Sequence, residues 1–213
     1  MSYNEKMFAL GSKRSIIREI FEHSKTRAKE IGAENVFDFS LGNPSVPAPK
    51  EVNDTICELL AKEDSVLLHG YTSAQGDAGV RAAIADYTNE CFGTSLSADN
   101  IYMTCGAAAS LSICLSALME EGKEDECIVF APFFTEYRVF VENAGARLTV
   151  CQPLANSLQL DLADLESKIS ENTKAIILNS PNNPSGVVYT EQTIVSVCDL
   201  LRRKEAEYGH PVY

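Results

Sequence analysis

The 213-residue sequence lacks several features that would point at once to a class of protein. No window approaches the ~20 uninterrupted apolar residues of a membrane-spanning helix, and residues 1–6 lead into no apolar signal core. Positive charge is scarce, since 18 basic residues face 30 acidic ones and the net charge is −12. This balance argues against nucleic acid or an anionic membrane as the main partner, although a locally positive site could still bind a small anion.

Motifs for metals and nucleotides are also missing. The seven cysteines include no Cys-x-x-Cys pair, so we expect no metal site and instead reduced, mostly buried thiols in a cytoplasmic protein. There is no G-x-G-x-x-G and no Walker lysine, which weakens a nucleotide-loop interpretation. The three histidines, His23, His69 and His210, are interpreted as structural or surface residues.

From about residue 101 the sequence alternates short apolar runs with amphipathic stretches. The pattern predicts strands at 101–104, 127–130, 147–151 and 175–179, and helices at 107–120, 134–143, 161–169 and 190–207, the last with Thr190 as N-cap. Apolar strands that alternate with amphipathic helices are typical of an α/β fold, with a mostly parallel sheet sandwiched by helices.

The first hundred residues are less regular. We predict an extended arm at 1–11, then a helix with Ser12 as N-cap and Ile16, Ile17, Ile20, Phe21 and Ala28 at helical spacing, a strand at 36–40, and helices at 50–62 and 76–91. Residues 209–213 have the composition of an approach to a further strand, so we expect the chain to continue beyond Tyr213.

Two loops have residues suited to binding a ligand. Residues 104–110, TCGAAAS, join a strand to a helix through small side chains, so free amides at the helix start could bind a phosphate. A tight turn packed with alanines is the alternative. Residues 179–186, NSPNNPSG, follow an apolar strand, which is where α/β proteins place sites.

Five segments, in order, resemble the fold-type I, pyridoxal 5'-phosphate (PLP) dependent aminotransferases of class I and II, the aspartate aminotransferase superfamily. They are LGNP at 41–44, GYT at 70–72, GAA at 106–108, PFFTEY at 132–137 and NPSG at 183–186. The stretch from Gly76 to Ala85, with Arg81, is similar to the helix that follows the family's tyrosine segment.

The resemblance implies a role for each matching residue. Gly106, Ala107 and Ala108 would bind the PLP phosphate, Phe134 would stack on the pyridine ring, and Asn183 would donate to the phenolic oxygen of the cofactor. Tyr71 would reach across a homodimer to the cofactor phosphate of the partner. Gly42 and Asn43 would lie beside the substrate carboxylate. An amino acid and a 2-oxo acid would be the substrates.

The resemblance also implies a domain arrangement. Residues 1–47 would be the arm, helix and substrate-side loop of the small domain, and residues 48–213 would be a PLP-binding large domain that stops before the Schiff-base lysine. Lys168 and Lys204 are interpreted as solvated helix-surface charges. The chain is thus predicted to be an N-terminal portion of an aminotransferase, inactive alone. A PLP-dependent lyase, decarboxylase or synthase of the same fold, or a non-catalytic binding protein, is the alternative.

Overall fold

A computed structural model describes residues 3–12, 16–40, 42 and 46–213. The chain divides into two compact units, one that ends at Tyr71 and one that spans Thr72–Tyr213. The predicted boundary between residues 47 and 48 concerns the domains of a complete enzyme, so it stays a prediction.

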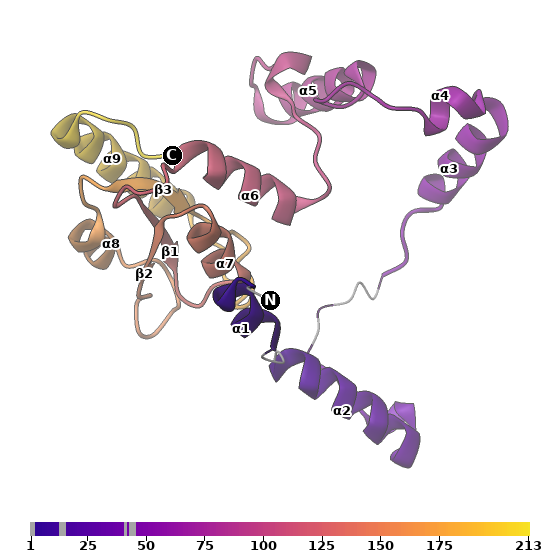
Figure 1. Cartoon of the computed structure of the whole chain (residues 1–213), viewed down its shortest axis with the longest axis horizontal. Coiled ribbons are helices and arrows are strands. Elements are labelled where there is room, and N and C mark those ends of the chain that lie inside the picture. Colours follow the sequence, from indigo (N-terminus) through magenta and orange to yellow (C-terminus); the bar gives the residue numbers. More distant parts are fainter. Residues whose placement is uncertain (1–2, 13–15, 41, 43–45) are drawn as a thin grey trace. The chain divides into compact units, whose positions relative to one another are not determined.

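The first unit is helical (Figure 1). It contains α1 (Glu5–Ser12), α2 (Ile16–Ile31), η1 (Ala33–Asn35), α3 (Lys50–Lys62) and α4 (Ser65–His69). The prediction of a helix over 50–62 is confirmed. None of the residues of α2, α3 or α4 is buried. In α2, Ile16, Ile17 and Ile20 are exposed, whereas Phe21 and Ala28 are partly buried.

Three predictions for this unit are wrong. Residues 5–12 form α1 instead of an extended arm, and Ser12 ends that helix, with its hydroxyl donating to the Phe8 carbonyl at 2.7 Å. Residues 36–40 form no strand, because Asp38 Oδ1 accepts both the amide and the hydroxyl of Ser40, at 2.8 and 2.6 Å. Such local bonds compete with a strand ladder, and they lower the pKa of Asp38.

The second unit is built on a parallel sheet of β1 (Glu126–Phe130), β2 (Arg147–Cys151) and β3 (Thr173–Ile177), in the order β2-β1-β3. In the middle strand, Ile128 lies opposite Thr149 on one side and Ile176 on the other. Three of the four predicted strands are therefore confirmed. Residues 101–104 form no strand. The Met103 amide instead donates to the Gln75 carbonyl at 3.0 Å, outside any sheet.

Helices cover both faces of this sheet, as predicted (Figure 1). Because strand side chains alternate between faces, Cys127 and Ala175 pack with α6 (Ala107–Leu118) and α7 (Glu136–Asn143), whereas Ile128 and Phe130 pack with α8 (Leu162–Lys168) and α9 (Glu191–Tyr208). Thr190 caps α9 by accepting from the Thr193 amide at 3.1 Å, which confirms the predicted N-cap.

The end of the chain pairs with β3 on the edge opposite β1. The Tyr213 amide donates to the Lys174 carbonyl at 2.9 Å, and the Ile176 amide donates to the Tyr213 carbonyl at 2.7 Å. Residue 213 thus bonds to residues on either side of Ala175, which is the parallel pattern. Tyr213 pairs with β3 as the prediction expects, but no strand is formed within residues 209–213, so the further strand stays a prediction.

The amino ends of the three strands are held by one buried carboxylate. Glu126 accepts from Thr173 Oγ1 at 3.1 Å, from Thr149 Oγ1 at 2.8 Å and forms an ion pair with Arg147. These bonds tie β1 to its neighbours on both sides at this end, where the register of β1 against β3 shifts between Glu126 and Cys127.

The remaining elements of the second unit are α5 (Ala78–Phe92), which covers most of the predicted helix 76–91, and η2 (Ala98–Asn100). Over residues 3–12, 16–40, 42 and 46–213, no helix is both long enough and apolar enough to span a membrane.

The interpretation of two kinds of side chain needs correction. Of the seven cysteines, which form no disulfide, Cys127 and Cys151 are buried and the other five are exposed, so the prediction of mostly buried thiols is wrong. Lys168 and Lys204 are also not fully solvated, since their side chains are 28% and 16% exposed. The amino group of Lys168 donates to the Val150 carbonyl at 2.8 Å and to Asp164 at 2.7 Å.

Candidate functional site

The loop at the start of α6 is shaped by Gly106. This residue is the N-cap of the helix, with φ of 90° and ψ of 169°, and it offers no side-chain cap. A Cβ placed there would meet no atom within 4 Å, so the backbone angle, rather than lack of space, is what favours glycine.

The first turn of α6 presents free backbone donors. The Gly106 carbonyl accepts from the amides of Ala109 and Ser110 at 3.1 and 3.2 Å, whereas the amides of Ala107 and Ala108 have no acceptor among the described residues. Both alanines are exposed, which argues against the alternative of an alanine-packed turn. Two free amides at a helix N-terminus suit an anion such as a phosphate.

The loop after β1 carries Phe134. Its ring is half-buried and meets Tyr137 edge-on, with 5.6 Å between centroids and 80° between planes. The Tyr137 amide also donates to the Phe134 carbonyl at 3.0 Å. Tyr137 is itself buried, and this desolvation raises the pKa of its hydroxyl. The near-perpendicular arrangement is one that aromatic pairs prefer, and the stacking role of Phe134 stays a prediction.

The loop after β3 places two adjacent asparagines differently. Asn182 is buried, and its Oδ1 accepts the amide and the hydroxyl of Ser185 at 3.1 and 2.8 Å. Its backbone bonds to Val187 and Gly186 close the loop. Sequence reasoning missed this organising residue, although its place directly after a proline, beside a second asparagine, was a usable turn signal.

The side chain of Asn183, in contrast, is exposed to solvent. Its amide donates to Asn179 Oδ1 at 2.8 Å, and its exposed side chain has no hydrogen-bond partner in the described part of the chain. Because β1 and β3 are adjacent and parallel, the loops that carry Phe134 and Asn183 leave the sheet at the same carboxyl edge. This edge is where open α/β sheets bind ligands.

The loop that precedes α6 and carries Gly106 does not leave the sheet at this carboxyl edge. Leu115 and Met119, at the C-terminal end of this helix, pack on the sheet, and Figure 1 shows α6 reaching from beside β3 toward the segment that leads to α5. Among the described residues, no hydrogen bond or ring contact joins Gly106, Ala107 or Ala108 to Phe134 or Asn183.

The other predicted residues lie in the first unit or outside the described residues. Tyr71 is the last residue of that unit and is fully exposed. Gly42 is exposed, and a Cβ added to it would meet no atom within 4 Å, whereas Asn43 lies outside the described residues. The roles of all three stay predictions. Within the described ranges, no three histidine, cysteine or acidic side chains come close enough together to hold a metal ion.

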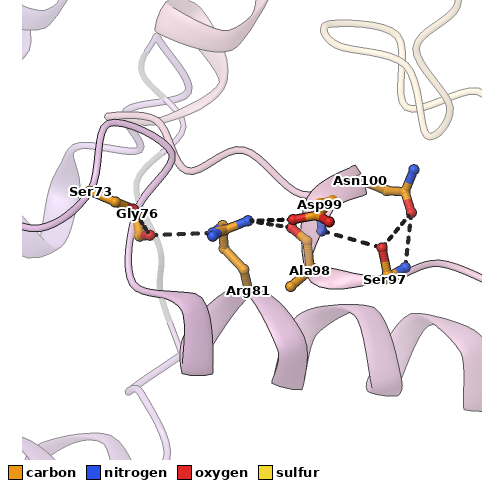
Figure 2. Close-up of polar contacts among 7 residues, drawn as sticks. All are labelled: Ser73, Gly76, Arg81, Ser97, Ala98, Asp99 and Asn100. Atoms are coloured by element: carbon orange, nitrogen blue, oxygen red, sulfur yellow. Dashed lines mark hydrogen bonds and ion pairs between the residues drawn. The ribbon is translucent and has the colours of Figure 1, made fainter.

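A buried arginine lies between the turn at Gly76 and the segment at Ala98 (Figure 2). Arg81, in the first turn of α5, is 6% exposed. Its Nε donates to the Gly76 carbonyl at 3.2 Å and its Nη1 to the Ala98 carbonyl at 2.5 Å. Asp99 is 4.0 Å from Nη1, but its side chain is 94% exposed.

Comparisons with known proteins agree with the resemblance to aminotransferases. The family described as aminotransferase class I and II matches residues 34–207. A crystal structure of an amino transferase from Eubacterium rectale is 56% identical, with a TM-score of 0.96 over 100% of this chain and 53% of that chain.

Two curated relatives are similar in the same way. An aspartate aminotransferase from Pyrococcus horikoshii is 32% identical over 94% of this chain and 50% of its own length. Another from Thermotoga maritima is 30% identical over 85% of this chain and 47% of its own length. The chain therefore spans about half the length of the curated relatives it matches.

Proposed function

This chain belongs to the class I and II aminotransferase family, and we propose that it supplies the phosphate- and ring-binding residues of an enzyme that moves an amino group between an amino acid and a 2-oxo acid. The observation that carries the proposal is the pair of free amides, Ala107 and Ala108, at the N-terminus of α6. A phosphorylated cofactor is the ligand that this pair suits in such a family.

The residues of this chain fit PLP in three ways. The amides of Ala107 and Ala108 would donate to its phosphate, the ring of Phe134 would lie against the pyridine, and the side-chain amide of Asn183 would donate to the ring oxygen. The free donors and the exposed amide of Asn183 support this assignment. Bound PLP supplies the electron sink, while these residues hold and orient it.

Proton transfer in transamination needs a free amine near the cofactor. Lys168 and Lys204 do not offer one, because their amino groups bond to Asp164 and to Glu207, each through an intrahelical contact. We propose that residues 1–213 alone do not turn over substrate, and the support for this is that the chain spans about half the length of its curated relatives. We also propose a cytoplasmic homodimer in which Tyr71 serves the site of the partner, and the exposure of Tyr71 supports this.

Replacement of Asn183 tests the site in the complete enzyme. We expect Asn183→Ala to shift the absorption spectrum of bound PLP, to change its pH response and to weaken PLP binding by about tenfold, because a donor to a charged ring oxygen is lost. Asn156→Ala, an exposed asparagine in the turn at 155–157, is the matched control and should change none of these. An unaltered spectrum in Asn183→Ala would remove this residue from the site. A complete enzyme that exchanged no amino groups would refute the proposed reaction.

A further inference from the structure

The geometry around Arg81 points to a role that the proposed binding residues do not fill. We propose that Arg81 is a positioning residue, which holds the turn that follows Tyr71 and the segment that precedes Gly106 together as one rigid piece. The inference rests on the proposed function, because the second segment leads to Gly106, Ala107 and Ala108, the residues assigned to the cofactor phosphate.

The turn itself is closed by several bonds. The Gly76 amide donates to the Ser73 carbonyl at 2.9 Å, and the Ser73 hydroxyl donates to the Gly76 carbonyl at 2.5 Å. The same Gly76 carbonyl accepts from Arg81 Nε (Figure 2). One oxygen thus joins the turn to α5, and Asp77, which caps α5 by accepting from the Val80 amide at 2.9 Å, follows directly.

The second segment is bound to the same turn. The Met103 amide donates to the Gln75 carbonyl at 3.0 Å, and a Cβ on Gly76 would lie 2.4 Å from Met103 Cγ. Arg81 adds a second link to this segment, because its Nη1 donates to the carbonyl of Ala98 in η2, the helix that leads into residues 101–104. Thr104 Oγ1 then reaches the Gly106 carbonyl at 3.3 Å.

The chemistry of arginine suits this junction. A buried charge is costly unless its donors are satisfied, and here main-chain carbonyls 22 residues apart, at 76 and 98, accept from different nitrogens of one planar group. Asp99 adds little, because its carboxylate is exposed at 4.0 Å. Lysine has one amino group and cannot reproduce the planar fork.

If Arg81 positions the amides that bind phosphate, its replacement should weaken binding only of a ligand that carries a phosphate. In the complete enzyme, we expect Arg81→Lys to weaken binding of PLP by about tenfold, since two charge-assisted bonds that fix the donors are disturbed. Pyridoxal, which lacks the phosphate, should bind to the variant as it does to the wild type. Asp99→Asn is the matched control and should leave both dissociation constants unchanged. Equilibrium dialysis and absorbance titration measure both ligands without an activity assay.

Each result decides between specific possibilities. Wild-type affinity for PLP in Arg81→Lys, or an equal loss for PLP and pyridoxal, would overturn the inference while leaving the proposed function intact. A wild-type enzyme that bound neither ligand would overturn the proposed function and the inference with it. If Arg81→Lys does not fold, Gly76→Ala separates the turn from Met103, because its Cβ would collide with that side chain. A folded Gly76→Ala enzyme with an unchanged ratio of PLP to pyridoxal affinity would also overturn the inference.

Discussion

Helices α2 and α9 show how differently two amphipathic helices of similar length can be used. Both carry apolar residues at helical spacing, but α9 buries Val197 and Leu200 against the sheet, whereas no described residue of α2 is buried and Ile16, Ile17 and Ile20 are exposed. A period of 3.6 residues specifies a helix and its apolar face. It does not specify what covers that face. In this chain the apolar face of α9 is buried because β1 and β3 lie against it.

Thiol reactivity gives the largest expected contrast between buried and exposed parts of the chain. Burial raises the pKa of Cys127 and of Cys151 to about 12, and a buried thiol reacts only when the protein opens. We expect the five exposed cysteines to react with a disulfide reagent at pH 8 at least about a thousandfold faster than these two, because opening costs several kcal/mol.

The measurement is a count of reacted thiols against time, first under native conditions and then in urea, with mass spectrometry to locate each site. All seven should react once the chain is unfolded. If Cys57 in α3 reacted as slowly as Cys127, α3 would be covered in the folded protein, and the contrast between the two regions would disappear.

Truncation of apolar side chains tests the same contrast by stability. Leu165 is fully buried between α8 and the sheet, whereas Ile17 in α2 is 44% exposed. We expect Leu165→Ala to lower the free energy of unfolding by about 2–5 kcal/mol, the usual cost of a core cavity, and Ile17→Ala to change it by less than about 0.5 kcal/mol. Urea unfolding of both variants measures the difference. An equally large loss for Ile17→Ala would mean that α2 packs against another surface.

The contrast also explains which predictions from sequence succeeded. Strands 127–130 and 147–151 and the helices around them were predictable, because their buried residues, such as Ile128 and Val141, pack against other elements within residues 107–213. Residues 101–104 have an equally apolar pattern but no strand beside them in the described residues, so pattern alone gave the wrong result. The exposed Cys57 and Cys114 were mispredicted for the same reason, since an apolar context does not guarantee a cover.

The candidate site was predictable for a different reason. Gly106 and Asn183 lie where small or polar residues interrupt an apolar pattern, and such interruptions mark loops. Asn182 was missed although its place after a proline marks a turn. Arg81 was not predicted as an organising residue, because its hydrogen-bond partners are main-chain carbonyls, which leave no trace in the sequence. Only the fold brings Gly76 and Ala98 to the same guanidinium.

Two ion pairs with the same spacing provide the smallest and sharpest comparison. In α8, Asp164 precedes Lys168 by four residues, and these side chains are only 24% and 28% exposed. In α3, Lys50 precedes Asp54, and the side chains are 82% and 58% exposed. The order of charges also differs, since a negative residue N-terminal to a positive one is the favourable order on a helix.

The pKa of Asp164 reflects its surroundings. Partial burial acts to raise this pKa, but the hydrogen bonds from Lys168 and from the Gln152 amide outweigh it, so that the pKa lies below the ordinary 3.8. A carboxyl whose pKa is lowered by folding stabilises the protein above the pKa of the unfolded chain. This contribution disappears as the pH falls through the folded-state pKa.

We therefore expect Asp164→Asn to destabilise the protein by about 1 kcal/mol at pH 7, with the difference from wild type shrinking as the pH falls below about 4. Asp54→Asn is the matched control, and it should cost less than about 0.5 kcal/mol at any pH, because exposed pairs contribute little. Urea unfolding between pH 3 and pH 7 measures both variants. A loss for Asp164→Asn that did not depend on pH would show that Asp164 acts through packing and its geometry, since the charge would then contribute nothing to the difference between α8 and α3.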